Sequence, residues 1–353
     1  MKTAAIVKPK EPLQAQDKET PKPKGPQVLV RVESCGVCHS DIHLWEGGYE
    51  GPGGQFLKAT ERGVKYPLVP GHEIAGVIDG IGEGVQDKFK KGDRVIVYPW
   101  IGEGLCPACR AGDENLCDDP QSIGIYDNGG YAEYMLVPNY RYLVGIDDAI
   151  DMDAASTLSC SALTAFTAVR NAELRESDNL VIVGAGGVGL MAIQLAKAVS
   201  GARIIAVDIE DGKLKIAKDN GADEIVNSKK ADEPAKIIKE LTSKNGADAV
   251  IDFVNSSQTV ETDMQFLRRR AKLVLVGLFG GELKLNLITM PTKAYRLIGS
   301  YTGNLADMVE LVSLAKRGVI KPIVSDRFRL EQATEALSKL KEGKVVGRGV
   351  INP

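Results

Sequence analysis

The strongest constraint on the fold is a glycine-rich turn that joins an apolar strand to a helix in the middle of the chain. The strand is expected over residues 179–183 and the helix over residues 190–199, with Gly-Ala-Gly-Gly-Val-Gly between them. In this context the first glycine permits a tight turn, the second lets a pyrophosphate approach the backbone, and the last lets helix pack on strand. The motif residues are Gly184, Gly186, Gly187, Val188 and Gly189. We therefore expect a dinucleotide-binding βαβ unit, with the phosphates at the helix N-terminus.

The following strand indicates which dinucleotide binds. It is expected over residues 203–208 and ends at Asp208, about 20 residues after the glycines, where a carboxylate binds a ribose 2′-hydroxyl. A carboxylate at this place repels a 2′-phosphate, which favours NAD over NADP. The alternative is an aspartate that only caps the next helix. Lys213 on that helix could reach the same ribose.

Strands and helices continue to alternate to about residue 296. The expected elements are buried strands over 247–254 and 272–277 and helices near 232–243 and 257–270. This alternation predicts a parallel, doubly wound sheet. Leu278 and Phe279 follow the end of one of these strands, where the nicotinamide is expected.

Residues 35–43 concentrate groups that bind metals and carry protons. This stretch holds Cys35, Cys38, His39, Ser40, Asp41 and His43. The Cys-x-x-Cys pair alone also fits a redox couple, half of a zinc ribbon, or two buried thiols. The chain has three histidines, and the third, His72, stands before Glu73 and a strand-like run. This scarcity favours one shared site over a surface histidine.

A second group of thiols lies further along the chain. Cys106, Cys109 and Cys117 lie close together in sequence, which in a reduced compartment predicts zinc. A closed structural zinc site needs four ligands, and no fourth cysteine is near. Glu103, three residues before Cys106, is therefore the expected fourth ligand, and an exposed loop carboxylate is the alternative.

Composition excludes several classes of function. The net charge is −3 and charges of both signs are mixed, so no basic face for nucleic acid is expected. No apolar run reaches the length of a membrane span or a signal sequence, so we expect a cytoplasmic protein in which six cysteines remain reduced. Short strands with many Gly and Pro turns fill the N-terminal part, which predicts a partly open β-barrel. Cys160 stands apart from the other thiols, in helix-compatible surroundings that also suit a buried structural thiol.

Taken together, these segments resemble the zinc-dependent medium-chain alcohol dehydrogenases, and most closely their archaeal tetrameric, NAD-dependent branch. The resemblance covers nearly the whole chain and rests on the order and spacing of the motifs at 35–41, 71–73, 103–117, 160 and 184–208. It implies a GroES-like catalytic domain over 1–155, to which 297–353 return, and a Rossmann domain over 156–296. The family usually has four cysteines at its structural zinc, so Glu103 is a departure from its pattern.

The resemblance also implies roles for individual residues. Cys38, His72 and Cys160 match the catalytic zinc ligands, Glu73 a carboxylate that can approach the zinc, and Asp41 the partner that orients the zinc histidine. Cys35 matches no ligand. For the cofactor, His39 matches a residue that faces the pyrophosphate and Thr164 a residue beside the nicotinamide. Ser40 and His43 would form the proton path. The apolar residues expected in the substrate pocket are Trp100, Ile125, Leu278 and Trp45.

The expected activity is reversible hydride transfer between a primary or secondary alcohol and NAD, giving an aldehyde or ketone. The partners expected are two zinc ions per subunit, a small alcohol or carbonyl substrate, and three further copies of the chain in a homotetramer, with no nucleic acid and no membrane. Polyol or sugar dehydrogenases of the same superfamily are one alternative, although many carry a carboxylate where Cys160 stands. A zinc- and nucleotide-binding protein without turnover is the other.

Overall fold

The computed structural model describes residues 1–85 and 88–353 and divides into two compact units. The first consists of Met1–Tyr49, Leu57–Leu163 and Gly303–Pro353, and the second of Glu50–Phe56 and Thr164–Thr302. Within the described ranges, no helix combines the length and the apolar character needed to cross a membrane.

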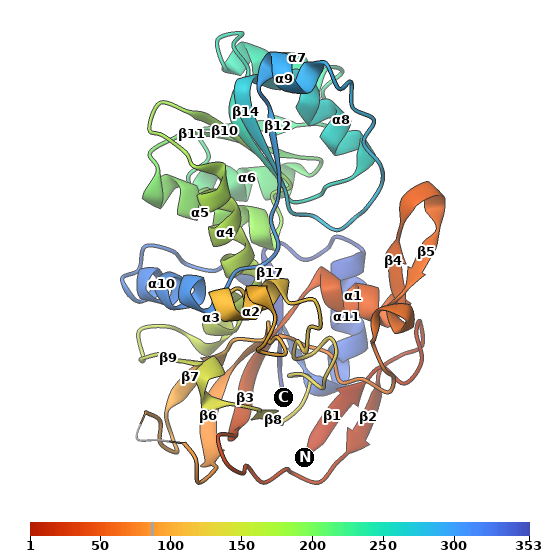
Figure 1. The fold of residues 1–353 in the computed structure, drawn as a ribbon, viewed down its shortest axis with the longest axis vertical. Helices are drawn as coiled ribbons and strands as arrows, with labels where there is room; N and C mark the ends of the chain where they lie inside the picture. Colours follow the sequence, from red (N-terminus) through yellow and green to blue (C-terminus); the bar gives the residue numbers. More distant parts are fainter. Residues whose placement is uncertain (86–87) are drawn as a thin grey trace. The chain divides into compact units, whose positions relative to one another are not determined.

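The first unit is built on a seven-stranded sheet in the order β16-β17-β3-β6-β7-β9, with β8 paired to β3 (Figure 1). Its strands are β3 (Val28–Val37), β6 (Glu73–Ile81), β7 (Arg94–Val97), β8 (Tyr134–Val137), β9 (Leu143–Gly145), β16 (Val324–Arg329) and β17 (Arg348–Asn352). The longest pairing joins β3 and β6 in antiparallel register, with Gly36 opposite Glu73. On the other side of β3, the antiparallel strand β17 places Val350 opposite Gly36. Residues from three distant parts of the sequence therefore meet at one end of this sheet.

Short helices and a small hairpin complete the first unit, and a second hairpin is divided, with Glu50–Phe56 counted in the second unit. Its helices are α1 (His39–Glu46), α2 (Pro107–Ala111), α3 (Met152–Thr157), a π-helical turn η5 (Leu158–Ala162), α10 (Leu305–Lys316) and α11 (Ala333–Lys341). Single 3-10 turns lie at Ala59–Arg62 (η2), Glu114–Leu116, Tyr140–Tyr142 and Leu330–Gln332. The hairpins pair β1 (Lys2–Ala5) with β2 (Gln14–Asp17) and β4 (Gly48–Glu50) with β5 (Phe56–Lys58).

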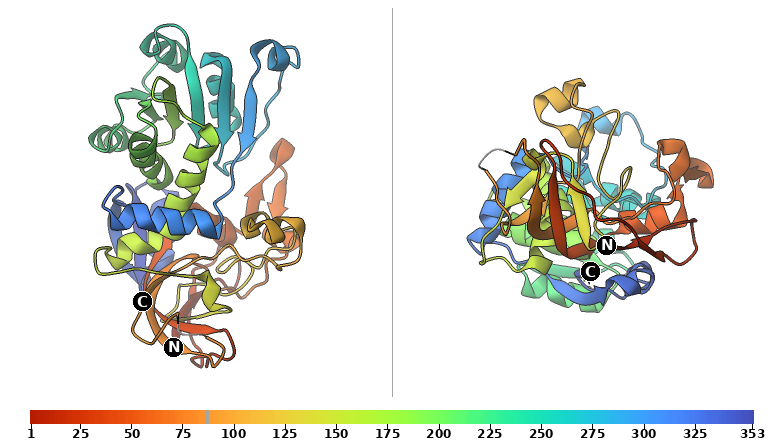
Figure 2. Two further views of the ribbon diagram at one scale, coloured as in Figure 1. Left: turned by 60° about the vertical axis from the view of Figure 1, so that its left-hand side comes forward. Right: turned by 90° about the horizontal axis from the view of Figure 1, so that it is seen from below.

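The second unit holds a six-stranded sheet in the order β12-β11-β10-β13-β14-β15, and every pairing is parallel. The strands are β10 (Asn179–Val183), β11 (Arg203–Asp208), β12 (Glu224–Asn227), β13 (Ala247–Asp252), β14 (Leu267–Leu275) and β15 (Arg296–Gly299). Helices lie on both faces, as Figures 1 and 2 show: α4 (Leu163–Ala172), α5 (Gly187–Val199), α6 (Asp211–Asp219), α7 (Pro234–Leu241), α8 (Ser257–Phe266) and α9 (Thr289–Lys293). The strand order reverses between β10 and β13, and ligands of such sheets bind at the strand carboxyl ends near that point.

The structure confirms the predicted fold class, a partly open β-barrel with a doubly wound parallel sheet. One predicted element was wrong in extent. The helix expected near 257–270 ends at Phe266, and β14 begins at Leu267, five residues before the strand expected from 272. The exposed run Arg268–Arg270 belongs to this strand, because its neighbours Leu267 and Ala271 are buried and continue it.

Candidate functional site

Four potential metal ligands, Cys38, His72, Glu73 and Cys160, meet inside the first unit. All four are buried, and one ligand atom of each lies within 4.8 Å of the others. Cys38 follows β3, His72 and Glu73 stand at the start of β6, and Cys160 lies on the π-helical turn. Because β3 and β6 are paired, the two strand ends bring Cys38 beside the His-Glu pair. A π-helical turn is uncommon and occurs preferentially at functional sites.

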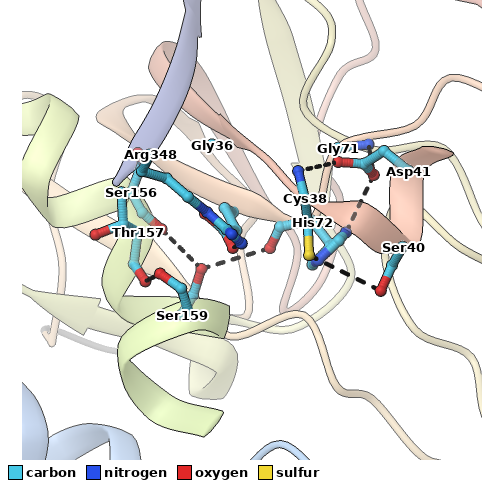
Figure 3. Close-up of polar contacts among 12 residues, drawn as sticks. Gly36, Cys38, Ser40, Asp41, Gly71, His72, Ser156, Thr157, Ser159 and Arg348 are labelled. Carbon is cyan, nitrogen blue, oxygen red and sulfur yellow. Dashed lines mark hydrogen bonds and ion pairs between the residues drawn. The ribbon is translucent and has the colours of Figure 1, made fainter. Parts of the chain in front are cut away.

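Asp41 connects the histidine of this cluster to the start of α1. Its Oδ2 accepts the Cys38 N–H (2.9 Å), which caps the helix, and its Oδ1 lies 3.3 Å from His72 Nδ1 (Figure 3). The Gly71 N–H and the buried Tyr131 hydroxyl also donate to this carboxylate, at 3.3 and 3.2 Å. The carboxylate is therefore fixed by several donors, and it fixes the orientation of the imidazole. Sequence reasoning missed Tyr131, which lies 90 residues further along the chain.

The free side of the imidazole faces the thiols. Both ring nitrogens of His72 are buried and make no hydrogen bond among the described residues, and Nδ1 has the 3.3 Å contact to Asp41 described above. Such a nitrogen costs free energy unless a ligand satisfies it. Two thiols and an imidazole form a Cys₂His donor set, which suits a zinc ion that keeps one position open. The buried cluster therefore fits zinc.

A hydrogen bond joins the two thiols and drives their pKa values apart. The hydrogen bond from Cys160 lowers the pKa of Cys38 well below its usual range, although burial alone would raise it. The same contact raises the pKa of Cys160 well above its usual range, with burial as the second cause. Zinc binds the thiolate form, so binding here releases the thiol proton.

Glu73 is held by a guanidinium that sequence reasoning missed. Arg348 on β17 donates to both carboxylate oxygens of Glu73, with Nε–Oε2 at 3.0 Å, and both side chains are buried. Gly36 makes room for this pair, because a Cβ on Gly36 would stand 2.0 Å from Glu73 Oε2. Burial raises the pKa of Glu73, and Arg348 opposes that shift. Glu73 thus lies within reach of the thiols while its charge is compensated from the other side.

The residues predicted to carry the proton lie on α1. Ser40 Oγ is 3.9 Å from Cys38 Sγ, and His43 lies one turn further along the helix. Burial lowers the pKa of His43 below its usual value, which favours the neutral imidazole that can accept a proton. His39, predicted to face the pyrophosphate, is exposed at the first position of the same helix.

The apolar residues predicted to line the substrate pocket lie in different surroundings. Trp100 is buried beside His72 with ring centroids 5.3 Å apart, and its indole N–H donates to Ser159 O. Ile125 is buried in the same unit, and Leu278 is exposed in the second unit. Trp45 instead donates to Glu11 O and carries the Lys341 ammonium over its ring.

The second cluster consists of Glu103, Cys106, Cys109 and Cys117, whose ligand atoms also lie within 4.8 Å of one another. Cys106 and Cys117 have sulfur atoms 3.8 Å apart, which equals the edge of a tetrahedron with zinc–sulfur bonds of about 2.3 Å. The Glu103 carboxylate accepts the Leu105 and Cys106 N–H groups and points into the loop. A Cβ on Gly102 would stand 2.4 Å from Cys109 Sγ, so this glycine permits the close packing. The donor set fits a four-coordinate zinc.

The glycine-rich turn lies in the second unit between β10 and α5. Gly184 has φ +92°, and a Cβ on Gly189 would stand 1.9 Å from Gly184 O, so both positions require glycine. Gly186 faces open space, where a phosphate can approach. Asp208 accepts the Ala185 N–H at 2.7 Å, which places the carboxylate beside the turn. The other residues predicted to contact the cofactor are all at least partly exposed in this unit: Thr164, Gly187, Val188, Lys213, Leu278 and Phe279.

Comparison with known proteins gives a consistent result across the chain. Residues 24–148 match the family model described as alcohol dehydrogenase GroES-like domain, and residues 187–317 match that of zinc-binding dehydrogenase. The NAD-dependent alcohol dehydrogenases of Sulfurisphaera tokodaii and Saccharolobus solfataricus are 45% and 42% identical, each over 100% of both chains. The crystal structure of an alcohol dehydrogenase from Aeropyrum pernix superposes with a TM-score of 0.91 at 34% identity, again over 100% of both chains. The chain belongs to the zinc-binding, GroES-like alcohol dehydrogenase family.

Proposed function

We propose that this protein is a zinc-dependent alcohol dehydrogenase that uses NAD. The reaction converts a primary or secondary alcohol and NAD⁺ into an aldehyde or ketone, NADH and a proton. The observation that carries the proposal is the buried Cys38, His72 and Cys160 set, with an unpartnered His72 Nε2, in a chain that also carries a glycine-rich turn beside Asp208. When bound, zinc supplies a Lewis acid that acidifies the alcohol, and NAD accepts the hydride.

The protein's own residues hold the reactants and move the proton. Asp41 holds the His72 ring so that Nε2 faces the thiols. Ser40, whose hydroxyl lies 3.9 Å from Cys38 Sγ, takes the proton of the alcohol, and His43, one turn further along α1, passes it outward. In the opposite direction the same path returns a proton to the carbonyl oxygen.

The cofactor assignment rests on Asp208 and its neighbours. Its carboxylate lies at the end of β11 and accepts the Ala185 N–H, so a bound 2′-phosphate would meet a negative charge. We assign the pyrophosphate to the helix start with His39, the adenosine ribose to Asp208 with Lys213, and the nicotinamide to Thr164, Leu278 and Phe279. The substrate pocket is assigned to Trp100, Ile125 and Leu278.

Three further proposals concern the domain boundaries, the second zinc and the assembly of subunits. We assign the catalytic domain to 1–155 with 297–353 and the dinucleotide-binding domain to 156–296, with Cys160 as the one metal ligand that lies in the second range. The second zinc, held by Glu103, Cys106, Cys109 and Cys117, stabilises its loop and takes no part in the reaction. A homotetramer in the cytoplasm is proposed, and the six free cysteines support a reducing compartment.

The test compares wild type with Ser40→Ala in alcohol-dependent NADH formation, with NAD and NADP in parallel and zinc measured in both proteins. We expect higher kcat/KM with NAD, and a fall in kcat of about 10²-fold or more in the variant, since a positioned acid–base group contributes about 10²–10⁴-fold. Zinc content should stay unchanged. Undiminished turnover in Ser40→Ala would reject the proton path, and absence of turnover in the zinc-loaded wild type with every alcohol would favour a non-catalytic protein.

A further inference from the structure

We propose that Tyr49 is a positioning residue that holds the His43 imidazole in place for proton transfer, and that the Arg62 guanidinium over the Tyr49 ring restrains Tyr49. This inference rests on the proposed function, because it concerns how the outer end of the assigned proton path is held. It goes beyond that assignment by naming two residues that none of the motifs includes.

The three side chains form a stack within the first unit. The rings of His43 and Tyr49 are stacked with centroids 4.5 Å apart and planes 28° apart. The Arg62 guanidinium carbon lies over the Tyr49 ring, 5.1 Å from its centroid. His43 comes from α1, Tyr49 from β4 and Arg62 from η2, so three separate elements supply the stack. Both His43 and Tyr49 are partly buried, and Arg62 is exposed.

Stacking is the contact that fixes the imidazole. In the described part of the chain, no side-chain hydrogen bond holds the His43 ring, whereas Asp41 fixes the ring of His72. Stacking engages the face of the ring and leaves both nitrogens free to exchange protons. Such freedom suits a group that must accept a proton from one side and release it to water on the other.

The phenol of Tyr49 acts as a neutral ring. Burial raises the pKa of Tyr49 to about 12, and the charge of Arg62 only partly opposes this. The hydroxyl therefore keeps its proton at working pH and does not compete with His43. A cation above an aromatic face is attracted to that face, so Arg62 restrains the ring on which His43 rests.

The same stack keeps water from one face of His43. Burial lowers the pKa of His43, while the charges of Cys38 and Glu46 raise it. Glu46 is itself paired with Lys341 of α11 at 2.6 Å, and Arg62 adds a positive charge beyond the Tyr49 ring. Removing the Tyr49 ring should expose the imidazole, raise its pKa and loosen its orientation together.

The experiment combines histidine NMR with steady-state kinetics on the zinc-loaded full-length protein. Three histidines make the spectrum simple, and His39→Gln assigns the exposed one. The variants are Tyr49→Leu, which removes the aromatic face, Tyr49→Phe, which keeps it without the hydroxyl, and Arg62→Gln. Tyr140→Leu is the matched control, because Tyr140 also carries a cation, Lys88 at 5.9 Å, without a contact to a histidine.

In Tyr49→Leu we expect the His43 titration to move to higher pH and kcat at neutral pH to fall roughly tenfold, less than the about 10²–10⁴-fold of a complete acid–base group. The acidic limb of the kcat profile should move to higher pH with the titration. Tyr49→Phe should keep both properties, Arg62→Gln should show a smaller change in the same direction, and Tyr140→Leu should match wild type.

The outcomes separate this inference from the proposed function. An unchanged His43 titration in a folded, zinc-loaded Tyr49→Leu protein overturns the positioning role, whatever happens to turnover. Equal loss in Tyr49→Phe and Tyr49→Leu also overturns it, because the hydroxyl would then be the active feature. A moved titration with full turnover overturns the assignment of His43 to the proton path, and with it the purpose of the stack.

Discussion

The cluster around His72 takes its four side chains from three separate parts of the sequence, whereas Glu103, Cys106, Cys109 and Cys117 lie within fifteen residues of each other. The first cluster is buried throughout, and its parts are joined by the pairing of β3 with β6 and by η5. The second is partly exposed, and two of its carboxylate contacts are to backbone N–H groups of its own loop.

The difference shows what each metal site depends on. The buried cluster is assembled by the sheet, so its geometry is set before metal binds and it can serve chemistry. The loop cluster lies on a short, partly exposed segment of the chain, so metal binding and local folding are coupled there. Losing the first metal should therefore affect turnover most, and losing the second should affect stability most.

The largest expected effect breaks the buried cluster at one ligand. Cys38→Ser should lower kcat/KM by about 10³-fold or more, because a Lewis acid is worth several kcal/mol of barrier and about 1.4 kcal/mol is tenfold. Zinc content should fall from two to one per subunit. Cys35→Ser is the matched control, since Cys35 lies on β3, the strand that leads to Cys38, and belongs to neither cluster. Zinc content of two in Cys38→Ser would show that Cys38 is not a ligand.

The next effect tests the charge balance of the same cluster. Arg348→Met leaves the Glu73 carboxylate buried without its partner, which should cost about 3–5 kcal/mol in the free energy of unfolding, measured with denaturant. Adding Glu73→Gln should recover most of that loss. In the exposed control pair, Arg31→Met removes the partner of Glu33 and should cost less than about 1 kcal/mol. An equal loss of unfolding free energy in Arg348→Met and Arg31→Met would mean that burial of the ion pair does not increase its contribution to stability.

A buried carboxylate pair in the second unit extends this comparison to a case without a cation. Asp252 accepts the Val254 and Asn255 N–H groups and the Thr259 hydroxyl, while Asp263 Oδ2 has no partner within the described ranges. Burial, together with the charge of Asp252, raises the pKa of Asp263 well above its usual range. The folded state therefore keeps a proton that the unfolded chain releases.

This raised pKa fixes the sign of a pH effect. The contribution of Asp263 to stability is complete below the carboxyl pKa of the unfolded chain and is lost as pH rises toward the folded pKa, by at most about 1.4 kcal/mol per pH unit. Asp263→Asn should flatten this part of the stability curve, because an amide donates to Asp252 without titrating. Glu261→Gln, on the exposed face of the same helix, should leave the slope unchanged. A slope that survives Asp263→Asn would assign the proton to another group.

The smallest expected effect concerns the loop cluster. Glu103→Ala should weaken zinc there and lower Tm by a few degrees, since about 1 kcal/mol moves Tm by roughly 2–4 °C in a large domain. Early turnover should stay normal, and a chelator should remove the loop zinc before the buried one. Asp119→Ala serves as a neighbouring control outside the ligand set, because it makes the same change in charge at an exposed position. Unchanged zinc content and Tm would make Glu103 an ordinary loop carboxylate.

The sequence predicted the parts that depend on local spacing. Cys106, Cys109 and Cys117 are close in sequence, and the glycines before α5 form a pattern tied to one turn. The buried cluster was assigned only through family resemblance, because no periodicity relates Cys38 to Cys160. Neither Tyr131 nor Arg348 was predicted from the sequence. Tyr131 acts through Asp41, 90 residues away in the sequence, and Arg348 acts through Glu73, 275 residues away. Neither residue stands in a recognisable sequence pattern.

The separation of Glu73 from Arg348 has a consequence for the order in which the protein matures during synthesis. The loop from Glu103 to Cys117 has all its ligands once residue 117 has left the ribosome, so it can take up metal while translation continues. The buried cluster already has Cys38, His72 and Cys160 by residue 160, yet Glu73 remains uncompensated until β17 adds to β3. We expect the nascent chain to acquire its two zinc ions in sequence, the loop ion first and the reactive one after the final strand has docked.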